Sequence, residues 1–353
     1  MLFDIGLFLG GLVVLVTGGH ALVNGSSALA RRLGLSPLVI GLTVVAWGTS
    51  APELAVSLGA ALDGRGEMAL GNVVGSNIIN ILGVLGAAAL FTPLVVSRRL
   101  VWRDIPILVA LSGAVFVLGY EGHLGRGEGG LLFLAGVGYT VHTIRSGRRV
   151  SVAVSDERPR AEVRLPRASL LVAVGMLLLV VGARWMVSAA TTFAQALGVS
   201  DLVVGLTVVA VGTSLPEVAA SIVAAWRGQR DMAVGNVIGS NIFNIVNVLG
   251  LTALLAPQGV PVPEPALRFD LPVMIVVAAA CLPIFFTGHR ISRWEGALFL
   301  GYYAVYLLFV VLQAEQHEAL PAFSRAMLFF VIPLTVATIG VVAWRELRPP
   351  ART

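Results

Sequence analysis

The chain has 353 residues, of which 57% are hydrophobic and 12% are charged, and its mean hydropathy is +0.90. These values exclude an ordinary soluble domain and predict a helical membrane protein with many spans. All 24 basic residues are arginine, and the formal net charge is +5. In a soluble chain this balance would suggest nucleic acid as a partner. Here the arginines fall in short loops, so we expect positive-inside bias, the lipid bilayer as a partner and no nucleic acid.

Apolar runs of about 20 residues recur along the chain and predict eleven membrane-spanning helices. In chain order they cover 3–33, 37–62, 68–91, 103–120, 128–145, 168–197, 201–226, 231–256, 270–288, 294–313 and 325–344. The first and sixth have about 30 residues, or about 45 Å as helix, which exceeds a hydrocarbon core of about 30 Å. They must therefore tilt or extend beyond the bilayer. Their many glycines predict close contact between helices.

One polar linker, residues 146–167, separates two sets of five predicted spans, 1–145 and 168–313. Because five is an odd number, the second set enters the membrane from the opposite side, which gives an inverted repeat. We therefore predict an all-α membrane protein with an inverted repeat of two five-helix halves, or ten core helices. Residues 314–353 add an eleventh helix and a basic tail.

The arginines predict the orientation of the chain in the membrane. With the amino terminus outside, 19 arginines fall on the inner side and four, at positions 65, 126, 268 and 325, fall outside. Arg184 lies near a helix end. We therefore expect a multi-pass protein of the cell (inner) membrane, with a cytoplasmic linker and a cytoplasmic carboxy terminus. The three tail arginines count as inner only if the eleventh helix crosses.

One stretch of the chain occurs twice. Residues 41–86 align without a gap with residues 205–250, 164 positions later, and 30 of the 46 pairs are identical. Both copies place a glutamate, Glu53 or Glu217, inside an apolar span. A carboxylate at membrane depth costs several kcal/mol by most measures and indicates a functional site.

Each copy also carries a helix breaker and polar stripes. Pro52 and Pro216 each leave a carbonyl four residues earlier without its helical partner, which predicts kinks near Thr49 and Thr213. Such carbonyls are tolerated at membrane depth only where they line a cavity or bind a ligand. On the next span, polar residues recur every fourth position, as Asn72, Ser76 and Asn80 and as Asn236, Ser240 and Asn244. The inverted halves would bring four broken helices together near the midplane.

This set of ligands contains two carboxylates, hydroxyls, amide oxygens and backbone carbonyls, without histidine or cysteine. Calcium takes about 6–8 such oxygen ligands, and sodium accepts the same neutral oxygens, whereas zinc or copper favours nitrogen or sulfur. A single kink, serine or asparagine in a membrane helix is commonly a packing feature. Their coincidence at equal spacing in both copies favours a site for Glu53 and Glu217. For Asn72 and Asn236 both interpretations stay open.

At these residues the chain resembles a known family. The segments GTSAPE with GNVVGSNIIN, and GTSLPE with GNVIGSNIFN, look like the two alpha repeats of the calcium/cation antiporters, specifically the sodium/calcium exchangers. The resemblance implies a central calcium site made by Glu53, Glu217 and the carbonyls of Thr49 and Thr213. It implies sodium sites at Ala46, Ser50, Ser76, Ala210, Ser214 and Ser240, with Asn80 at the middle. It also implies that the first and sixth spans slide to give alternating access.

The chain departs from the family's pattern in two places. Many prokaryotic relatives and the potassium-dependent exchangers carry aspartate where this chain has Asn244, which argues against potassium coupling. The eleventh span exceeds the family's usual ten. Cation/proton exchangers of the superfamily place a glutamate soon after the Gly-Asn pair, but here Val73 and Val74 follow. Sodium coupling is thus favoured over proton coupling.

We therefore expect an electrogenic antiporter that exchanges calcium for sodium, with no enzyme activity and no cofactor. The alternative is an antiporter of protons against calcium or another divalent cation. A cation channel fits less well, because inverted repeats with broken helices favour alternating access. An intramembrane hydrolase that uses paired carboxylates fits least well, because hydroxyl-lined broken helices suit ion dehydration.

Overall fold

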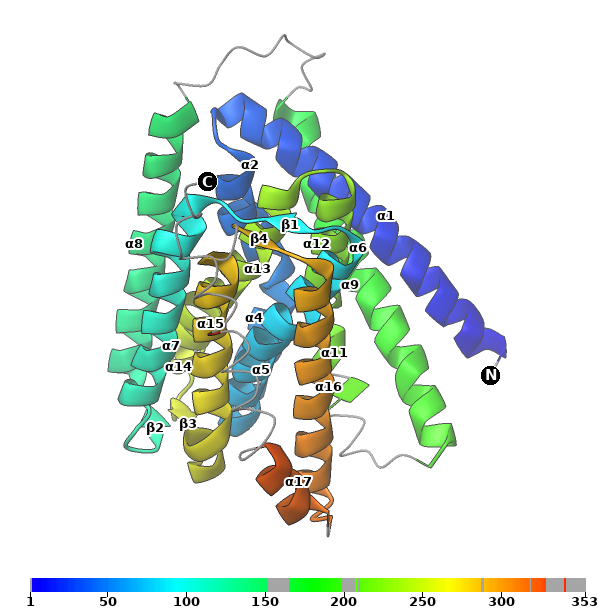
Figure 1. The fold of residues 1–353 in the computed structure, drawn as a ribbon, viewed down its shortest axis with the longest axis vertical. Helices are drawn as coiled ribbons and strands as arrows, with labels where there is room; N and C mark the ends of the chain where they lie inside the picture. Colours follow the sequence, from blue (N-terminus) through cyan, green and yellow to red (C-terminus); the bar gives the residue numbers. More distant parts are fainter. Residues whose placement is uncertain are drawn as a thin grey trace, which may run out of the picture.

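The computed structural model describes residues 2–151, 165–198, 207–208, 210–286, 289–317, 319–327 and 340. Nearly all of them are helical (Figure 1). The predicted eleventh span, 325–344, lies almost entirely outside the described residues, as does the beginning of the predicted span 201–226. Among the described residues, six helices are long and apolar enough to cross a membrane, or seven if the bent pair Pro37–Thr49 and Ala51–Leu62 forms one span.

The first half runs from α1 to α8. In order it contains α1 (Leu2–Leu33), α2 (Pro37–Ile40), η1 (Gly41–Val45), α3 (Ala46–Thr49), α4 (Ala51–Leu62), α5 (Gly66–Ile79), η2 (Asn80–Leu85), α6 (Gly86–Phe91), β1 (Leu94–Val95), η3 (Leu100–Asp104), α7 (Ile105–Leu118), β2 (His123–Leu124) and α8 (Arg126–Ser151). Segments marked η are π-helical. Helix α8 extends to Ser151, so it reaches into the range predicted as a linker.

The second half repeats this order. It contains α9 (Leu165–Ala196), α11 (Ala210–Thr213), α12 (Leu215–Trp226), α13 (Arg230–Phe243), η5 (Asn244–Leu249), α14 (Gly250–Leu255), β3 (Val260–Pro261), η6 (Ala266–Asp270), α15 (Leu271–Phe286), β4 (Arg290–Ile291), α16 (Arg293–Ala314) and α17 (Leu320–Ala326). From α4 to α6 and from α12 to α14 the bounds are offset by the same 164 residues as the sequence repeat. The two halves therefore share their local structure as well as their sequence.

The expectation of four broken helices needs correction. A helix breaks at Ser50 and at Ser214, but residues 66–91 and 230–255 each form one continuous span of 26 residues. Neither of those spans contains proline, so nothing removes a backbone donor. Instead each passes through a π-helical segment, η2 or η5. Such segments widen a helix locally and are frequent at functional sites.

Helices α1 and α9 lie against each other on one flank of the molecule (Figure 1). A Cβ atom on Gly18 would lie 2.9 Å from the carbonyl oxygen of Gly175, and one on Gly25 would lie 2.8 Å from that of Ala168. A Cβ on Gly182 would lie 2.7 Å from the carbonyl oxygen of Gly11. Because the partner numbers fall as those of α1 rise, the two helices are antiparallel. The prediction of close contact through glycines is confirmed.

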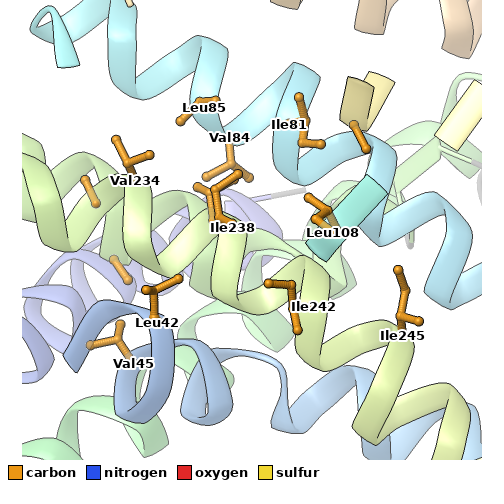
Figure 2. Packing of buried hydrophobic residues seen from close by; sticks show 14 of the residues in the cluster. Leu42, Val45, Ile81, Val84, Leu85, Leu108, Val234, Ile238, Ile242 and Ile245 are labelled. Atoms are coloured by element: carbon orange, nitrogen blue, oxygen red, sulfur yellow. The ribbon is translucent and has the colours of Figure 1, made fainter. Parts of the chain in front are cut away.

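Helix α13 lies at the centre of the apolar core (Figure 2). Its buried side chains Val234, Ile238 and Ile242 lie among side chains of η1, η2 and α7. Figure 2 shows this packing for Leu42, Val45, Ile81, Val84, Leu85 and Leu108. The second half therefore packs a deeply buried helix onto η1, η2 and α7 of the first half.

In the part of the chain that the structure describes, two short antiparallel strand pairs add to the predicted all-α fold. Strand β1 pairs with β4, with Leu94 opposite Ile291, and β2 pairs with β3, with Leu124 opposite Val260. Each pair joins one strand from each half, and the two pairs lie toward opposite ends of the molecule (Figure 1). Strands of two residues carry no periodicity, so they could not be predicted from the sequence.

Candidate ion-binding site

The backbone breaks in the same way in both copies of the repeat. Helix α3 ends at Thr49 and α4 begins at Ala51, with a bend of 42° between the two parts. Ser50, between them, has φ −84° and ψ 3°, and Ser214 has φ −91° and ψ 3°. This sparsely populated region is where many active-site residues lie. Pro52, in the first turn of α4, cannot donate a backbone hydrogen bond, which explains the break.

The two glutamates follow these breaks by one turn. Glu53 and Glu217 are both 0% exposed, and their carboxylates are close enough to interact electrostatically. Ser50 donates a hydrogen bond from Oγ to Oε1 of Glu217 over 3.3 Å. Ser214 lies beside the Glu53 carboxylate. Each break therefore presents its serine to the glutamate of the other half.

Thr49 connects the first break to helix α13. Its Oγ1 donates to Oδ1 of Asn236 over 3.2 Å and lies 3.3 Å from Oγ of Ser240. Thr49 and Ser240 both also lie beside Glu217. One hydroxyl group of α3 and one of α13 thus lie beside the same carboxylate.

Asn72 and Asn236 make equivalent contacts within their own halves. Nδ2 of Asn72 donates to Oγ of Ser57 over 2.9 Å and to the backbone carbonyl of Glu53 over 3.3 Å. Nδ2 of Asn236 donates to Oγ of Ser221, also over 2.9 Å. The side-chain nitrogens therefore hold α5 to α4 and α13 to α12. Of the two interpretations left open by the sequence, these contacts favour a packing role.

Many polar atoms of the cluster are buried without a hydrogen-bond partner in the described part of the chain. They are both carboxylate oxygens of Glu53, Oε2 of Glu217, Oγ of Ser76, Oγ of Ser214, and the amide oxygens and nitrogens of Asn80 and Asn244. An uncompensated buried charge costs several kcal/mol or more. Oxygen atoms in this number and of this kind fit calcium or sodium as cargo.

The remaining predicted residues lie on the elements that carry the cluster. Ala46 is the first residue of α3 and is fully buried, and its carbonyl accepts from the backbone N–H of Ser50 over 3.0 Å. Ala210 and Thr213 begin and end α11, the equivalent segment. Asn80 and Asn244 begin the π-helical segments, of which η2 packs against α12 and η5 against α4. Ser76 is buried on α5.

Sequence reasoning missed two features near the site. Asn77 and Asn241 are buried, and the amide atoms of Asn241 have no partner in the described residues, whereas Nδ2 of Asn77 lies 3.6 Å from Sδ of Met274. Their equal positions in the two copies were the available signal. The second feature is a cavity of about 560 Å³ beside the breaks. It is lined by Ala51, Pro52, Ala55, Val56, Val180, Ala183, Arg184, Val187, Ser188, Gly212, Thr213 and Pro216.

Comparison with known proteins agrees with this architecture. The family described as "Sodium/calcium exchanger protein" matches residues 3–145 and 168–312. The sodium/calcium exchanger MaX1 of Methanosarcina acetivorans is 35% identical over 336 residues, covering 84% of this chain and 95% of the relative. The inner membrane protein YrbG of Escherichia coli is 37% identical over 316 residues, covering 87% of this chain and 96% of the relative.

A solved structure is similar over the same length. The sodium-calcium exchanger NCX_Mj, soaked with Na+ and Sr2+, superposes with a TM-score of 0.75 at 32% identity, covering 87% of this chain and 98% of that one. The matched residues include both copies of the repeat and both glutamates. The chain therefore belongs to the sodium/calcium exchanger family of multi-pass membrane antiporters.

Proposed function

We propose that this protein is a secondary active antiporter that exchanges Ca2+ for Na+ by alternating access. One observation carries the proposal: two fully buried carboxylates, one from each half, lie together among buried oxygens that lack partners in the described chain. Such a cluster is stable only when a cation or protons compensate its charge. The family supports a cation.

The family resemblance implies a role for each of these residues. Glu53 and Glu217 bind calcium together with the backbone carbonyls of Thr49 and Thr213. Sodium binds at flanking positions made by neutral oxygens, and Asn80 and Asn244 act as neutral donors at the middle. The flanking positions are Ala46, Ser50, Ser76, Ala210, Ser214 and Ser240. No cofactor takes part, and the cations are the substrates.

The charge of the cluster makes the exchange electrogenic. Two carboxylates are balanced by one calcium ion or by two sodium ions. One additional sodium ion, as the family resemblance implies, leaves the sodium-loaded protein with one excess positive charge. Moving that charge through a membrane potential is worth about 2.3 kcal/mol per 100 mV.

Alternating access rests on a ten-crossing inverted repeat. Three features support it. The element bounds recur after 164 residues, α1 and α9 are in antiparallel contact, and each strand pair joins one strand from each half. An inverted repeat places the site between two related halves, so that each half can open it to one side.

Calcium binding tests the site directly. Calcium should raise the unfolding temperature of the purified protein, and sodium should compete, because a ligand at about 100 times its Kd stabilises a protein by about 2.7 kcal/mol. Glu53→Gln and Glu217→Gln should each remove the calcium effect. Glu67→Gln, which alters an exposed carboxylate at the start of α5, is the matched control. A full calcium response in either site variant would mean that the site lies elsewhere.

A further inference from the structure

Helix α1 packs closely on α12 in this structure. The rings of His20 and Trp226 lie 5.8 Å apart, and the guanidinium of Arg227 donates a hydrogen bond to Oδ1 of Asn24. A Cβ on Gly19 would lie 3.2 Å from Cγ2 of Val223. The C-terminal half of α12 is therefore held to α1 by ring, polar and backbone contacts together.

The equivalent surfaces of the other half do not meet in the same way. The repeat offset of 164 residues relates α1 to α9 and α4 to α12. It relates Gly19 to Ala183, His20 to Arg184, Asn24 to Ser188, Ala219 to Ala55, Trp226 to Leu62 and Arg227 to Asp63. Four of these equivalents, Ala183, Arg184, Ser188 and Ala55, line the cavity of about 560 Å³. A cavity therefore lies where the other half has a contact.

The two surfaces lie toward opposite ends of the molecule. The turn after α12 is near the β1–β4 pair, because Arg230 donates to Oγ1 of Thr92, just before β1. The turn after α4 is near the β2–β3 pair, because Gly66 lies against Pro261 of β3. The structure is thus closed between α1 and α12 toward one end and open between α9 and α4 toward the other.

The residues at the open surface have complementary charges. Asp63 caps the C-terminal end of α4, and its present partner is Arg65, 3.1 Å away, with both side chains more than 60% exposed. Such an exposed pair holds its partners weakly. Arg184 is one turn before Ser188 on the face of α9 that lines the cavity, as His20 is one turn before Asn24 on the face of α1 that meets α12. If α9 packed on α4 as α1 packs on α12, Arg184 would lie beside Leu62 and within reach of Asp63.

We propose that Arg184 and Asp63 form an interhelical ion pair when the cavity between α9 and α4 closes, and that the contact of Asn24 with Arg227 opens in the same step. This proposal rests on the alternating access of the proposed function, and it names the two residues that meet when the cavity closes. The glycines of α1 and α9 bring the two backbones into close contact, so in this proposal the two helices move as one unit and the two contacts exclude each other. The apolar lining of the cavity strengthens the attraction between the two charges as water leaves.

Cysteine pairs in full-length protein in liposomes test the exclusion. Asn24→Cys with Arg227→Cys should cross-link in the molecules in which α1 packs on α12. Arg184→Cys with Asp63→Cys should cross-link in the molecules in which α9 packs on α4. Trp185→Cys with Asp63→Cys is the matched control, because Trp185 is directed at Gly10 of α1 rather than at the cavity, and it should not cross-link. Arg227→Ala removes the Asn24–Arg227 contact. It should raise the cross-linking yield of the Arg184–Asp63 cysteine pair about two- to fivefold, the range expected for one exposed polar contact.

Charge exchange tests the ion pair itself. Ser188→Cys with Leu62→Cys reports closure of the cavity while both charges remain. In that background, Asp63→Asn or Arg184→Gln should lower the cross-linking yield about two- to fivefold, and Asp63→Arg combined with Arg184→Asp should restore it. If the Arg184–Asp63 pair never cross-links while the Asn24–Arg227 pair does, the proposed closed contact is wrong. If the exchanged charges do not restore the yield, the ion pair is wrong.

Cross-linking is read without transport, which separates this proposal from the proposed function. Loss of calcium–sodium exchange in wild-type protein, together with ion-independent cross-links at both pairs, would contradict the proposed function and leave the contact standing. Exchange in wild type without any Arg184–Asp63 cross-link would overturn the contact alone.

Discussion

At the scale of single residues, Asn80 and Asn244 are the positions that most distinguish this site. Each begins a π-helical segment, each is fully buried, and none of their amide atoms has a partner within the described residues. Because η2 packs against α12 and η5 against α4, each amide lies on an element that borders the glutamate helix of the other half. This placement suits a neutral oxygen donor beside two carboxylates.

A third carboxylate at this position should change the response to pH. Asn244→Asp adds a like charge to the pair Glu53 and Glu217, which favours protonation of the cluster. Calcium exchange should therefore lose activity at a higher pH than in wild type, and potassium should become a possible additional cargo. Asn80→Asp should behave in the same way. The measurement is calcium flux in proteoliposomes as a function of pH.

Asn247→Asp is the control for this prediction. Asn247 lies on the same segment as Asn244, but its Oδ1 is close to Gly136 of α8. Its substitution should affect the pH profile less. An unchanged profile in Asn244→Asp beside an altered one in Asn80→Asp would contradict the symmetry of the middle of the site.

The sequence predicted the chemistry of the site better than its hydrogen bonds. Glu53 and Glu217 could be predicted as site residues because a carboxylate is costly in an apolar span, and because both copies of the repeat carry one at the same position. The donation from Ser50 to Glu217 and the contact of Thr49 with Asn236 join residues more than 160 positions apart. Such contacts depend on how the two halves pack together, and the spacing of residues along one helix does not predict this packing.

At the scale of elements, α1 and α9 show what close packing requires. A Cβ on Gly175 would lie 2.5 Å from the backbone nitrogen of Leu22, closer than real side chains come to backbone. The length of these two spans and the role of their glycines could be predicted from the sequence. The π-helical segments were not, because nothing in a run such as NILGVL distinguishes a π turn from an α turn.

Gly175→Ala should therefore destabilise the protein. The added methyl group forces α9 away from α1, and overpacking of this kind costs about 1–3 kcal/mol. Thermal unfolding in detergent should show a lower midpoint. Calcium exchange should slow, because the proposed alternating access needs the two helices to move together. Gly6→Ala is the control, since its Cβ meets no described atom within 4 Å. Equal unfolding midpoints for the two variants would contradict close packing as the function of Gly175.

At the scale of the whole molecule, the bias of 19 inner arginines against four outer ones predicts the orientation of the chain. A reporter fused after Thr353 should be cytoplasmic, and one fused after Gln316 should lie outside. The apolar run 326–344, which lies almost entirely outside the described residues, would then cross the membrane. Identical locations for the two reporters would mean that this run does not cross.

In the proposed mechanism sodium drives the movement of calcium, and the exchange carries charge. The decisive measurement is the uptake of calcium isotope into sodium-loaded proteoliposomes, with and without an outward sodium gradient. We predict uptake against a calcium gradient only when the sodium gradient is present, and faster uptake at an inside-positive potassium-diffusion potential. Uptake that follows a pH gradient instead of sodium, proceeds only down the calcium gradient, or does not depend on voltage would rule out electrogenic exchange of calcium for sodium.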